Sequence, residues 1–408
     1  MMGVGQPGSP TTWDLMPGDR RAVHVASRPF RLQAGGFSRS VPGLASAISG
    51  AGYETILCIT GDTAPCCTSQ VRVLRFRGIG PLDWSPGLRS ALTRAAKEGL
   101  DVIHSHGLWL DPNHAAAAVA RRRGIPLVIS PRGMLDPGAL AISSLRKRLV
   151  GFLWDRRDLR RASCLHALTA GERAAIRRLG LTNPVALIPN GVDTSEFEHP
   201  PSAEVITSLF PALAGKKWLL FMSRVHPKKG LIPLALAWND VARAFPEWVL
   251  VVAGPDEVGH RREVEEIARA ALADGRLVFT GPVSGEERLA LLSHAKAFVL
   301  PSFSEGFPMA LLEAAACGLP ILATPQCGFR EVAEVGGGLL ADPEAASLTR
   351  GLTDLLSLDD VQQASMGSRG RALVKERYTW TAVGEKMASV YEWLVTGGPA
   401  PACVEVIP

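Results

Sequence analysis

The chain has 408 residues, of which 47% are hydrophobic and 20% are charged, and its formal net charge at pH 7 is +5. This composition excludes a disordered or fibrous chain, and the length exceeds what one hydrophobic core usually holds, so we expect two globular domains. No stretch reaches the roughly 18 apolar residues that a membrane-spanning helix needs.

Seven cysteines are present, which is an odd number, and no two of them form a Cys-x-x-Cys pair. This usage is typical of reduced thiols in the cytosol, so we expect no disulfide and no metal site. Residues 1–19 lack the apolar segment of a signal peptide, and we expect them to be flexible. The composition therefore favours a cytoplasmic protein, either soluble or peripheral on the inner face of the membrane.

The first expected strand covers residues 21–26, and Gly35 and Gly36 precede an expected helix at about 38–49. Two glycines before a helix allow a phosphate or a sugar to approach the backbone closely. An ordinary strand-to-helix turn would use the same residues, and the pattern alone leaves both interpretations open.

Strands continue to alternate with helix-length segments as far as an expected linker, which runs to about residue 201. The alternation predicts a doubly wound parallel sheet, in which ligands bind at the carboxyl ends of the strands. The other strands expected in this half are 54–59, 71–76, 101–106, 126–130, 164–169 and 185–188.

Two of these strand ends carry candidate site residues. His104 and His106 lie on one face of their strand, because strand side chains alternate. Without a third ligand nearby, such a pair more often packs or hydrogen-bonds than binds metal. His106, nearer the carboxyl end, is the better ligand-binding candidate, and Arg132 follows the strand that ends at Ser130. Thr169-x-x-Glu172 is interpreted as a capping box with a structural role.

Residues 121–180 are strongly basic, with 14 lysines and arginines against 4 acidic residues. Between residues 146 and 161 the basic residues are interleaved with apolar ones, which suits an anionic membrane surface. A solvated basic surface explains the pattern about as well. We do not expect nucleic acid as a partner, because no nucleic-acid-binding module is visible.

The second half again begins with a strand, at residues 218–222, and a loop with Arg224, Lys229 and Gly230 follows it. Arginine and lysine in a strand-to-helix loop complement a diphosphate, although Gly230 would also suit a plain surface turn before a helix. Further strands are expected at 249–253, 277–283 and 297–300, and helices at 344–357, 361–376 and 380–395.

Residues 298–320 read as a strand, a tight loop and a short apolar helix, with Pro308 at its first position. Glu313 is the only charged Asp, Glu, Lys or Arg between Glu305 and Arg330. Burying a lone carboxylate is unfavourable, so Glu313 should have a partner or bind a ligand. Ser302-x-x-Glu305 could be a capping box, but that would place Pro308 inside the helix, which proline breaks.

If Glu305 instead precedes the helix, the amides of Gly306, Phe307 and Met309 point outward with the positive end of the helix dipole. This arrangement suits an anion, most naturally a phosphate. The spacing of Glu305 and Glu313 within Pro-Ser-x-x-Glu-Gly-Phe-Pro resembles the signature of glycosyltransferase family 4, whose members are retaining enzymes of the GT-B fold.

The resemblance covers about residues 20–395 and implies an α/β protein of GT-B type. Two Rossmann-like, doubly wound domains would face a deep cleft, with an acceptor-binding domain at 20–200 and a nucleotide-sugar-binding domain at 213–378. A helix at 379–396 would cross back onto the first domain. Residues 397–408 are rich in proline and are expected to be flexible.

The resemblance also implies roles for individual residues. Glu305 would contact the transferred sugar and Glu313 the ribose, while Arg224 and Lys229 match the family's Arg-x-x-x-x-Lys-Gly element. Arg132 stands where the family often has a histidine in the acceptor cleft. The donor-binding candidates are Gly36, Arg224, Lys229, Gly254, Gly281, Val283, Glu305, Gly306, Phe307, Pro308 and Glu313; the catalytic candidates are Glu305, Arg224, Lys229 and His106; the acceptor candidates are His106 and Arg132.

The implied activity is transfer of a sugar from a nucleoside diphosphate-sugar to a hydroxyl of a carbohydrate or lipid-linked acceptor, in polysaccharide or glycolipid biosynthesis. The chain contains no Asp-x-Asp, which favours a metal-independent mechanism without a cofactor. One alternative is a glycosidase, which needs two carboxyls about 5–9 Å apart across one bond. The other is a nucleotide-sugar-binding or scaffold protein without turnover, which the arginine at position 132 would support.

Overall fold

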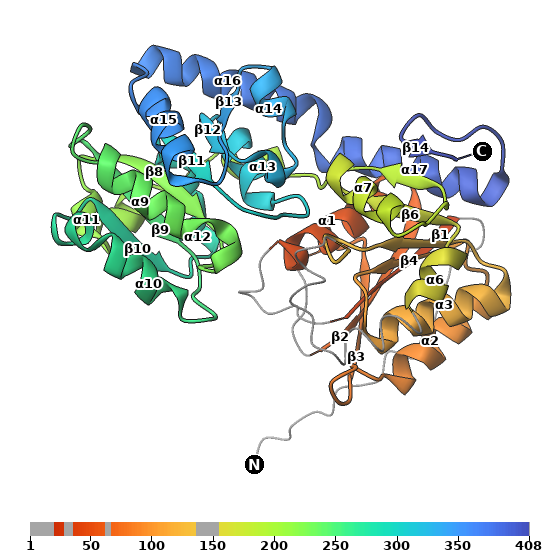
Figure 1. Cartoon of the computed structure of the whole chain (residues 1–408). Helices are drawn as coiled ribbons and strands as arrows, with labels where there is room; N and C mark the ends of the chain where they lie inside the picture. Colours follow the sequence, from red (N-terminus) through yellow and green to blue (C-terminus); the bar gives the residue numbers. More distant parts are fainter. Residues whose placement is uncertain (1–19, 28–35, 62–66, 136–154, 408) are drawn as a thin grey trace.

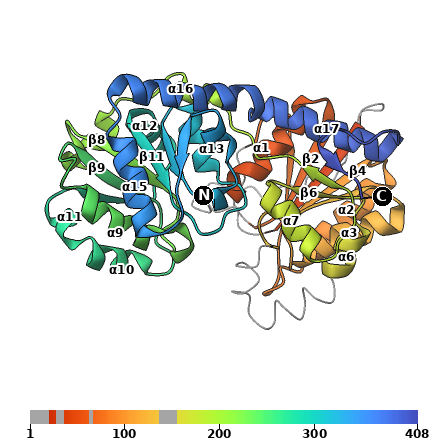
Figure 2. The same cartoon turned by 45° about the horizontal axis from the view of Figure 1, so that its top comes forward.

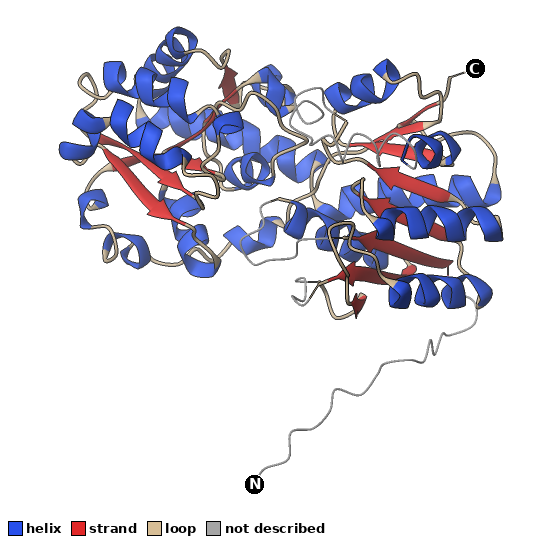
Figure 3. Ribbon diagram, turned by 60° about the horizontal axis from the view of Figure 1, so that its bottom comes forward, coloured by secondary structure: helices blue, strands red, loops and turns tan. Residues whose placement is uncertain are grey.

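The computed structural model describes residues 20–27, 36–61, 67–135 and 155–407, which form two domains, each built on a β-sheet (Figure 1). Helices lie around both sheets (Figure 3). The expected leader, Gly35 and most of the basic stretch at 146–161 lie outside the described residues. None of the described helices is long and apolar enough to cross a membrane.

The sheet of the first domain has the order β14-β7-β6-β5-β4-β1-β2-β3 among the described residues, and its strands are parallel except for β14. The strands are β1 (Arg20–Ala26), β2 (Tyr53–Thr60), β3 (Arg72–Phe76), β4 (Val102–His106), β5 (Leu127–Ser130), β6 (Cys164–Ala167), β7 (Val185–Leu187) and β14 (Val404–Glu405). β1, β2, β4, β5 and β6 are buried along most of their length, as expected for strands that are covered on both faces. The strand order reverses beside β1, which is where ligands bind in such sheets.

Helices cover both faces of this sheet. One core cluster joins Val23 and Ile103 to α2 (Pro86–Lys97) and α3 (Asp111–Arg123). Another joins Ala22 and Val102, on the opposite face, to α1 (Phe37–Gly50) and α17 (Trp380–Thr396). The other helices among the described residues of this domain are α6 (Arg156–Arg161) and α7 (Ala170–Arg178). His24 and His104 are register partners on the face that α17 covers.

The second domain is an all-parallel sheet of order β10-β9-β8-β11-β12-β13. Its strands are β8 (Lys217–Met222), β9 (Trp248–Ala253), β10 (Leu277–Gly281), β11 (Ala297–Leu300), β12 (Ile321–Ala323) and β13 (Gly338–Leu340). Its helices are α8 (Glu204–Thr207), α9 (Leu231–Val241), α10 (His260–Ile267), α11 (Arg269–Ala273), α12 (Gly285–His294), α13 (Met309–Ala316), α14 (Glu331–Glu334), α15 (Ala345–Leu356) and α16 (Asp360–Arg377), and short 3-10 turns cover Thr194–Phe197, Pro211–Leu213, Pro227–Lys229 and Pro325–Cys327.

The two doubly wound domains are confirmed, and so is the return of the last long helix. After α16, α17 runs back along the first domain and packs against α1 (Figure 2). Glycines allow this close approach, because a Cβ on Gly43 would lie 2.3 Å from Trp380 and one on Gly384 would lie 2.6 Å from the carbonyl oxygen of Ala47.

The expectation of a flexible end at 397–408 is wrong for the described residues. Val404 and Glu405 form β14, which pairs antiparallel with β7. Glu405 also forms ion pairs with Arg173 and Arg177 of α7. The proline-rich composition predicted disorder. The segment is instead held on the sheet by the β14–β7 pairing and by the Glu405 carboxylate, which lies between two arginines.

We expect Gly43→Ala to lower the free energy of unfolding by about 1–3 kcal/mol, because the added methyl group must displace Trp380 at the α1–α17 contact. Gly50→Ala, at the end of the same helix, is the matched control, because its added Cβ would meet no atom within 4 Å beyond the adjacent backbone of its own helix and its chain neighbours. Urea unfolding measures both variants. An unchanged midpoint for Gly43→Ala would contradict the tight α1–α17 packing.

Candidate functional site

The loop between β11 and α13 places Glu305 before the helix. Pro308 is the N-cap and α13 begins at Met309, so the capping-box interpretation of Ser302 and Glu305 is wrong. Ser302 Oγ instead donates to Glu305 Oε1 over 2.8 Å. The same carboxylate oxygen pairs with Lys229 Nζ, and only about a tenth of each side chain is exposed.

Lys229 reaches Glu305 because its loop lies directly against the end of β11. Gly230 has a φ of +71°, and a Cβ there would lie 2.0 Å from the carbonyl oxygen of Pro301. The backbone amide of Phe303 donates to the carbonyl of Lys228 over 2.9 Å. Only glycine permits both this conformation and this approach, so Gly230 does more than start α9.

Glu313 has the partners that its burial requires. Its side chain is 2% exposed, and it pairs with Arg39 through Oε1 and with Arg288 through Oε2, the latter at 2.9 Å. Both arginines also reach Glu196, at 3.2 and 2.5 Å. Burial alone would lower the pKa of Arg288, but Glu313 and Glu196 outweigh that effect and its pKa is raised.

These ion pairs join the two domains, since Arg39 belongs to α1 and Arg288 to α12. Neither arginine was predicted from the sequence. Arg39 lies three positions after Gly36 in the first turn of a helix, which is a weak signal, and Arg288 lies in a surface-type helix with no local pattern. Only the tertiary fold brings them to one carboxylate.

Residues of the first domain also lie against the start of α13. A Cβ on Gly133, whose φ is +79°, would come within 3.3 Å of Gly306 Cα, and a Cβ on Gly36 would lie 3.5 Å from Met309 Cγ. Asn190 Nδ2 donates to the carbonyl of Phe307 over 2.9 Å. Asn190 was also missed, although it follows the carboxyl end of β7, where ligand-binding residues of such sheets gather.

Arg132 lies beside this junction. Its φ of +54° is in the left-handed region, which a non-glycine residue adopts at an energetic cost that functional sites often bear. Nη1 donates to Ser40 Oγ over 2.9 Å and to Asn190 Oδ1 over 3.3 Å, and Nε donates to His106 Nδ1 over 3.2 Å. Nη2 is buried and has no hydrogen-bond partner in the described part of the chain. Burial lowers the pKa of Arg132 to about 10, so it remains charged at neutral pH.

Glu172 supports the turn that carries Arg132. Thr169 Oγ1 accepts from the Glu172 amide over 3.1 Å, as expected at a helix start. The Glu172 carboxylate, however, accepts from the amides of Gly133 and Leu168 over 2.5 and 2.7 Å. The residue interpreted as a simple helix cap therefore also fixes the loop beside the domain junction.

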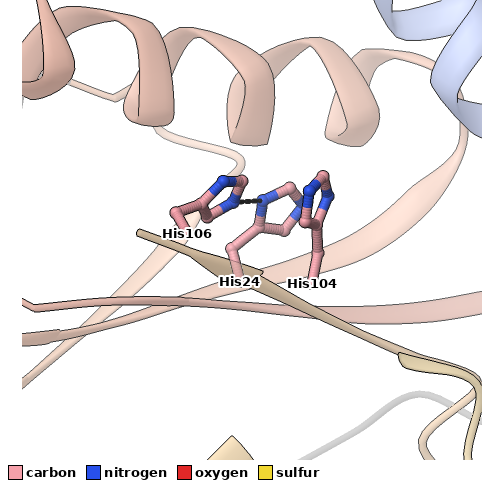
Figure 4. A group of neighbouring side chains, drawn as sticks. All are labelled: His24, His104 and His106. Atoms are coloured by element: carbon pink, nitrogen blue, oxygen red, sulfur yellow. Dashed lines mark hydrogen bonds between the residues drawn. The ribbon is translucent and has the colours of Figure 1, made fainter. Parts of the chain in front are cut away.

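A third histidine joins the pair on β4. His24, from β1, lies beside His104 and His106 (Figure 4), and one ring nitrogen from each lies within 4.8 Å of the others, close enough to hold a metal ion. The expectation that no third ligand lies nearby is therefore wrong. His106 is fully buried behind Arg132, and both its ring nitrogens bond to protein atoms, so this geometry does not support direct contact with an acceptor.

The other predicted donor residues differ in their surroundings. Arg224 is exposed and pairs with Glu257 at 3.1 Å. Gly254 has a packing role, because a Cβ there would lie 1.9 Å from the carbonyl oxygen of Ser223. Gly281, by contrast, has a φ of +73° and open space where a Cβ would be, so its conformation and not its packing requires glycine.

Phe307, Pro308 and Val283 contribute mainly through backbone and packing. The Phe307 ring stacks on Tyr378 at 5.8 Å and meets Phe329 edge-on, so its side chain belongs to the core. Val283 is half-buried against the same core. The candidate ligand-binding region is therefore the start of α13, where Lys229, Arg288 and Arg39 surround the carboxylates of Glu305 and Glu313. Cations bind phosphates and carboxylates accept from hydroxyls, so this region suits a ligand that carries both groups.

Two family descriptions match most of the chain: "Glycosyl transferase 4-like domain" over residues 35–191 and "Glycosyl transferases group 1" over residues 210–373. The chain is 32% identical over 320 residues to a D-inositol 3-phosphate glycosyltransferase of Frankia alni, covering 75% of this chain and 76% of that protein. It is 27% identical over 314 residues to one component of the phosphatidylinositol N-acetylglucosaminyltransferase of Arabidopsis thaliana, covering 75% of this chain but only 64% of that protein.

The fold is also similar to that of HepE from Anabaena, whose structure was solved in complex with UDP. The TM-score is 0.69 and the identity 19%, over 90% of this chain and 98% of that one. This likeness confirms the GT-B architecture of the two domains.

Proposed function

Because the chain belongs to glycosyltransferase family 4, we propose that it moves a sugar from a nucleoside diphosphate-sugar to a hydroxyl of a phosphate-bearing carbohydrate or lipid-linked acceptor, with retention of configuration. The observation that carries the donor half is the group of three cations, Lys229, Arg288 and Arg39, around the two carboxylates at α13. Labelled transfer from a panel of nucleoside diphosphate-sugars tests the activity, and NMR of the product's anomeric centre tests retention.

Charge complementarity supports the donor site. The leaving diphosphate gains negative charge in the transition state, and preorganised cations with a helix N-terminus stabilise that charge without a metal ion. Lys229 lies where it can do this, while Glu305 keeps the lysine in place and meets the sugar. Arg224 is the second cation of the loop, and it would exchange its exposed partner Glu257 for a phosphate. We infer a reaction that needs no cofactor.

Glu313 is proposed to bind the ribose. Two arginines hold its carboxylate, so a ribose hydroxyl must replace part of one arginine contact. The released guanidinium would then lie beside the nucleotide, where it can meet a phosphate. A thermal-shift comparison of UDP, GDP, ADP and dTDP identifies the base, because a ligand at 100 times its dissociation constant stabilises a protein by about 2.7 kcal/mol.

Glu313→Gln should weaken donor binding by about tenfold or more, equivalent to about 1.4 kcal/mol, whereas Glu305→Gln should mainly lower kcat. The ribose is held equally in the ground and transition states, but the transferred sugar changes between them. Calorimetry and steady-state kinetics separate the two effects. Glu196→Gln is the matched control, since Glu196 contacts the same two arginines from outside α13. Wild-type donor affinity in Glu313→Gln would refute the ribose assignment.

The acceptor half rests on Arg132. The two relatives compared above are named for phosphatidylinositol and for D-inositol 3-phosphate, and both molecules join a phosphate to a polyhydroxylated ring. Arg132 is a charged guanidinium at the domain junction, with one buried nitrogen that has no partner among the described residues. Arginine can bind a phosphate with two parallel hydrogen bonds. It cannot serve as a general base, because it remains protonated.

We expect Arg132→Gln to reduce kcat/KM for inositol 3-phosphate more than tenfold, about 1.4 kcal/mol, and to leave donor affinity unchanged. With unphosphorylated inositol the variant and the wild type should differ little, because the lost contact is to the phosphate. Arg173→Gln, on α7 of the same domain and paired with Glu405, controls for a general loss of charge. An equal loss of kcat/KM with both acceptors would show that Arg132 does not bind the phosphate.

We further propose that the enzyme works at the inner face of an anionic membrane. In the described part of the basic stretch, α6 exposes Arg157, Arg160 and Arg161 while Asp158 and Leu159 are buried, so its basic residues face outward. Exposed cations are attracted to anionic lipid, each by about 1 kcal/mol.

Replacing Arg157, Arg160 and Arg161 with glutamine should weaken binding to phosphatidylserine vesicles, by about fivefold for each cation removed. Binding should also fade as salt screens the charges. Co-sedimentation across a salt series measures this. The double variant Arg261→Gln/Arg262→Gln, on exposed α10, is the control. Equal binding of the wild type to neutral vesicles would rule out an electrostatic membrane contact.

A further inference from the structure

We propose that four buried histidines, Ser130 and Tyr391 form a one-directional chain of hydrogen bonds that positions the guanidinium of Arg132. The contacts follow one line: Arg132 Nε to His106 Nδ1 (3.2 Å), His106 Nε2 to His24 Nδ1 (2.9 Å), His24 Nε2 to Tyr391 Oη (3.4 Å), Tyr391 Oη to His104 Nδ1 (2.5 Å), His104 Nε2 to Ser130 Oγ (2.6 Å), Ser130 Oγ to His166 Nδ1 (2.6 Å) and His166 Nε2 to the carbonyl of Ile188 (2.7 Å).

The two ends of this chain determine the position of every proton in it. Arg132 can only donate, so His106 must accept at Nδ1 and carry its proton on Nε2. At the other end the carbonyl of Ile188 can only accept, so His166 must donate from Nε2 and accept at Nδ1. Ser130 therefore gives its proton to His166 and accepts from His104.

Tyr391 completes the assignment in the middle. Because His104 donates from Nε2, it accepts at Nδ1 from the Tyr391 hydroxyl, whose oxygen then accepts from His24 Nε2. The opposite direction fails at both ends, since it would place two donors between Arg132 and His106 and two lone pairs between His166 Nε2 and the carbonyl of Ile188. All four imidazoles are thus neutral and protonated on Nε2.

Burial agrees with this protonation state. The four histidines are at most 1% exposed, and burial lowers the pKa of His24 and of His166 to about 3. An added proton on any ring would face a donor that is already in place. The same argument applies to the three-histidine cluster of Figure 4: within the described chain each lone pair that a metal would use already accepts a hydrogen bond.

The chain links the returning helix to the candidate acceptor residue. Tyr391 lies on α17, and its hydroxyl is the only group in the line that does not come from the sheet region of the first domain. Tyr391, the histidines and Ser130 are therefore positioning residues, and what Arg132 binds rests on the proposed function.

The protonation pattern is tested by long-range ¹H–¹⁵N NMR on the full chain labelled at histidine. Four of the nine histidines should show the neutral Nε2–H form unchanged from pH 8 to pH 5. His24→Gln, His104→Gln, His106→Gln and His166→Gln assign the signals. An Nδ1–H form or a doubly protonated ring at pH 6 in any of these four histidines would overturn the proposal. A shift of the His24, His104 and His106 signals on adding Zn²⁺ would also overturn it.

The positioning role is tested by Tyr391→Phe, which removes only the hydroxyl. We expect about a tenfold rise in KM for the phosphate-bearing acceptor, unchanged donor affinity, and loss of the uniform Nε2–H pattern. Tyr53→Phe is the matched control, because the Tyr53 ring packs edge-on against Tyr391 and its buried hydroxyl has no hydrogen-bond partner among the described residues. Unchanged acceptor KM in a folded Tyr391→Phe would overturn the positioning role.

Ser130 provides a second pair of variants if Tyr391→Phe does not fold. Ser130→Ala breaks the chain, whereas Ser130→Thr keeps the hydroxyl, so the acceptor KM should rise in the first and return toward the wild-type value in the second. Equal KM values in the two variants would overturn the proposal. A correct histidine pattern together with a wild-type Arg132→Gln would refute the acceptor assignment and leave the chain intact.

Discussion

The domain junction depends on the unfavourable free energy of burying charge. Glu313 lies on an apolar helix and is almost completely buried, so its carboxylate must be paired, and the arginines that pair with it come from both domains. Lys229 with Glu305, and Arg132 with its neutral partners, obey the same requirement. The charged groups proposed to bind substrate therefore also connect the domains.

This dual use affects how the site can respond to a ligand. Under the proposed ribose assignment, a nucleotide that contacts Glu313 would compete with Arg39 of the opposite domain. Donor binding would then be linked energetically to the relative position of the domains. Other contacts between the domains involve the backbone. Asn190 donates to a backbone carbonyl at the start of α13, and Gly133 packs against Gly306. These contacts involve no charged group.

Much of the fold could be predicted because its signals are local. The apolar runs of β1, β2 and β8 to β11 and the ends of α15 to α17 lie within a few residues of the predicted bounds. β12, β13 and β14 could not be predicted, since two or three residues are too few for a hydrophobic pattern. β14 exists only because β7 offers it an edge and α7 offers two arginines to Glu405.

The residues of the candidate site also differ in whether local sequence identifies them. Glu305, Glu313 and Lys229 could be selected as candidates because each lies in a short motif that indicates a ligand-binding role. Arg39, Arg288, Asn190 and His24 could not, because each acts on a partner that is distant in sequence. His106 was selected for its place at a strand end, but His24 and His104 pack against it and make it part of the interior.

The path of α17 and β14 also bears on the order in which the protein can fold during synthesis. The core of the first domain includes Met387, Val390 and Tyr391, and the last position in its sheet belongs to residues 404–405. A ribosome makes those residues only after the entire second domain. The second domain can therefore complete its core first, while in the domain that was translated earlier the part of the sheet face that α17 covers is still exposed. Chaperones that shield apolar surface would be needed most for the N-terminal half of the chain.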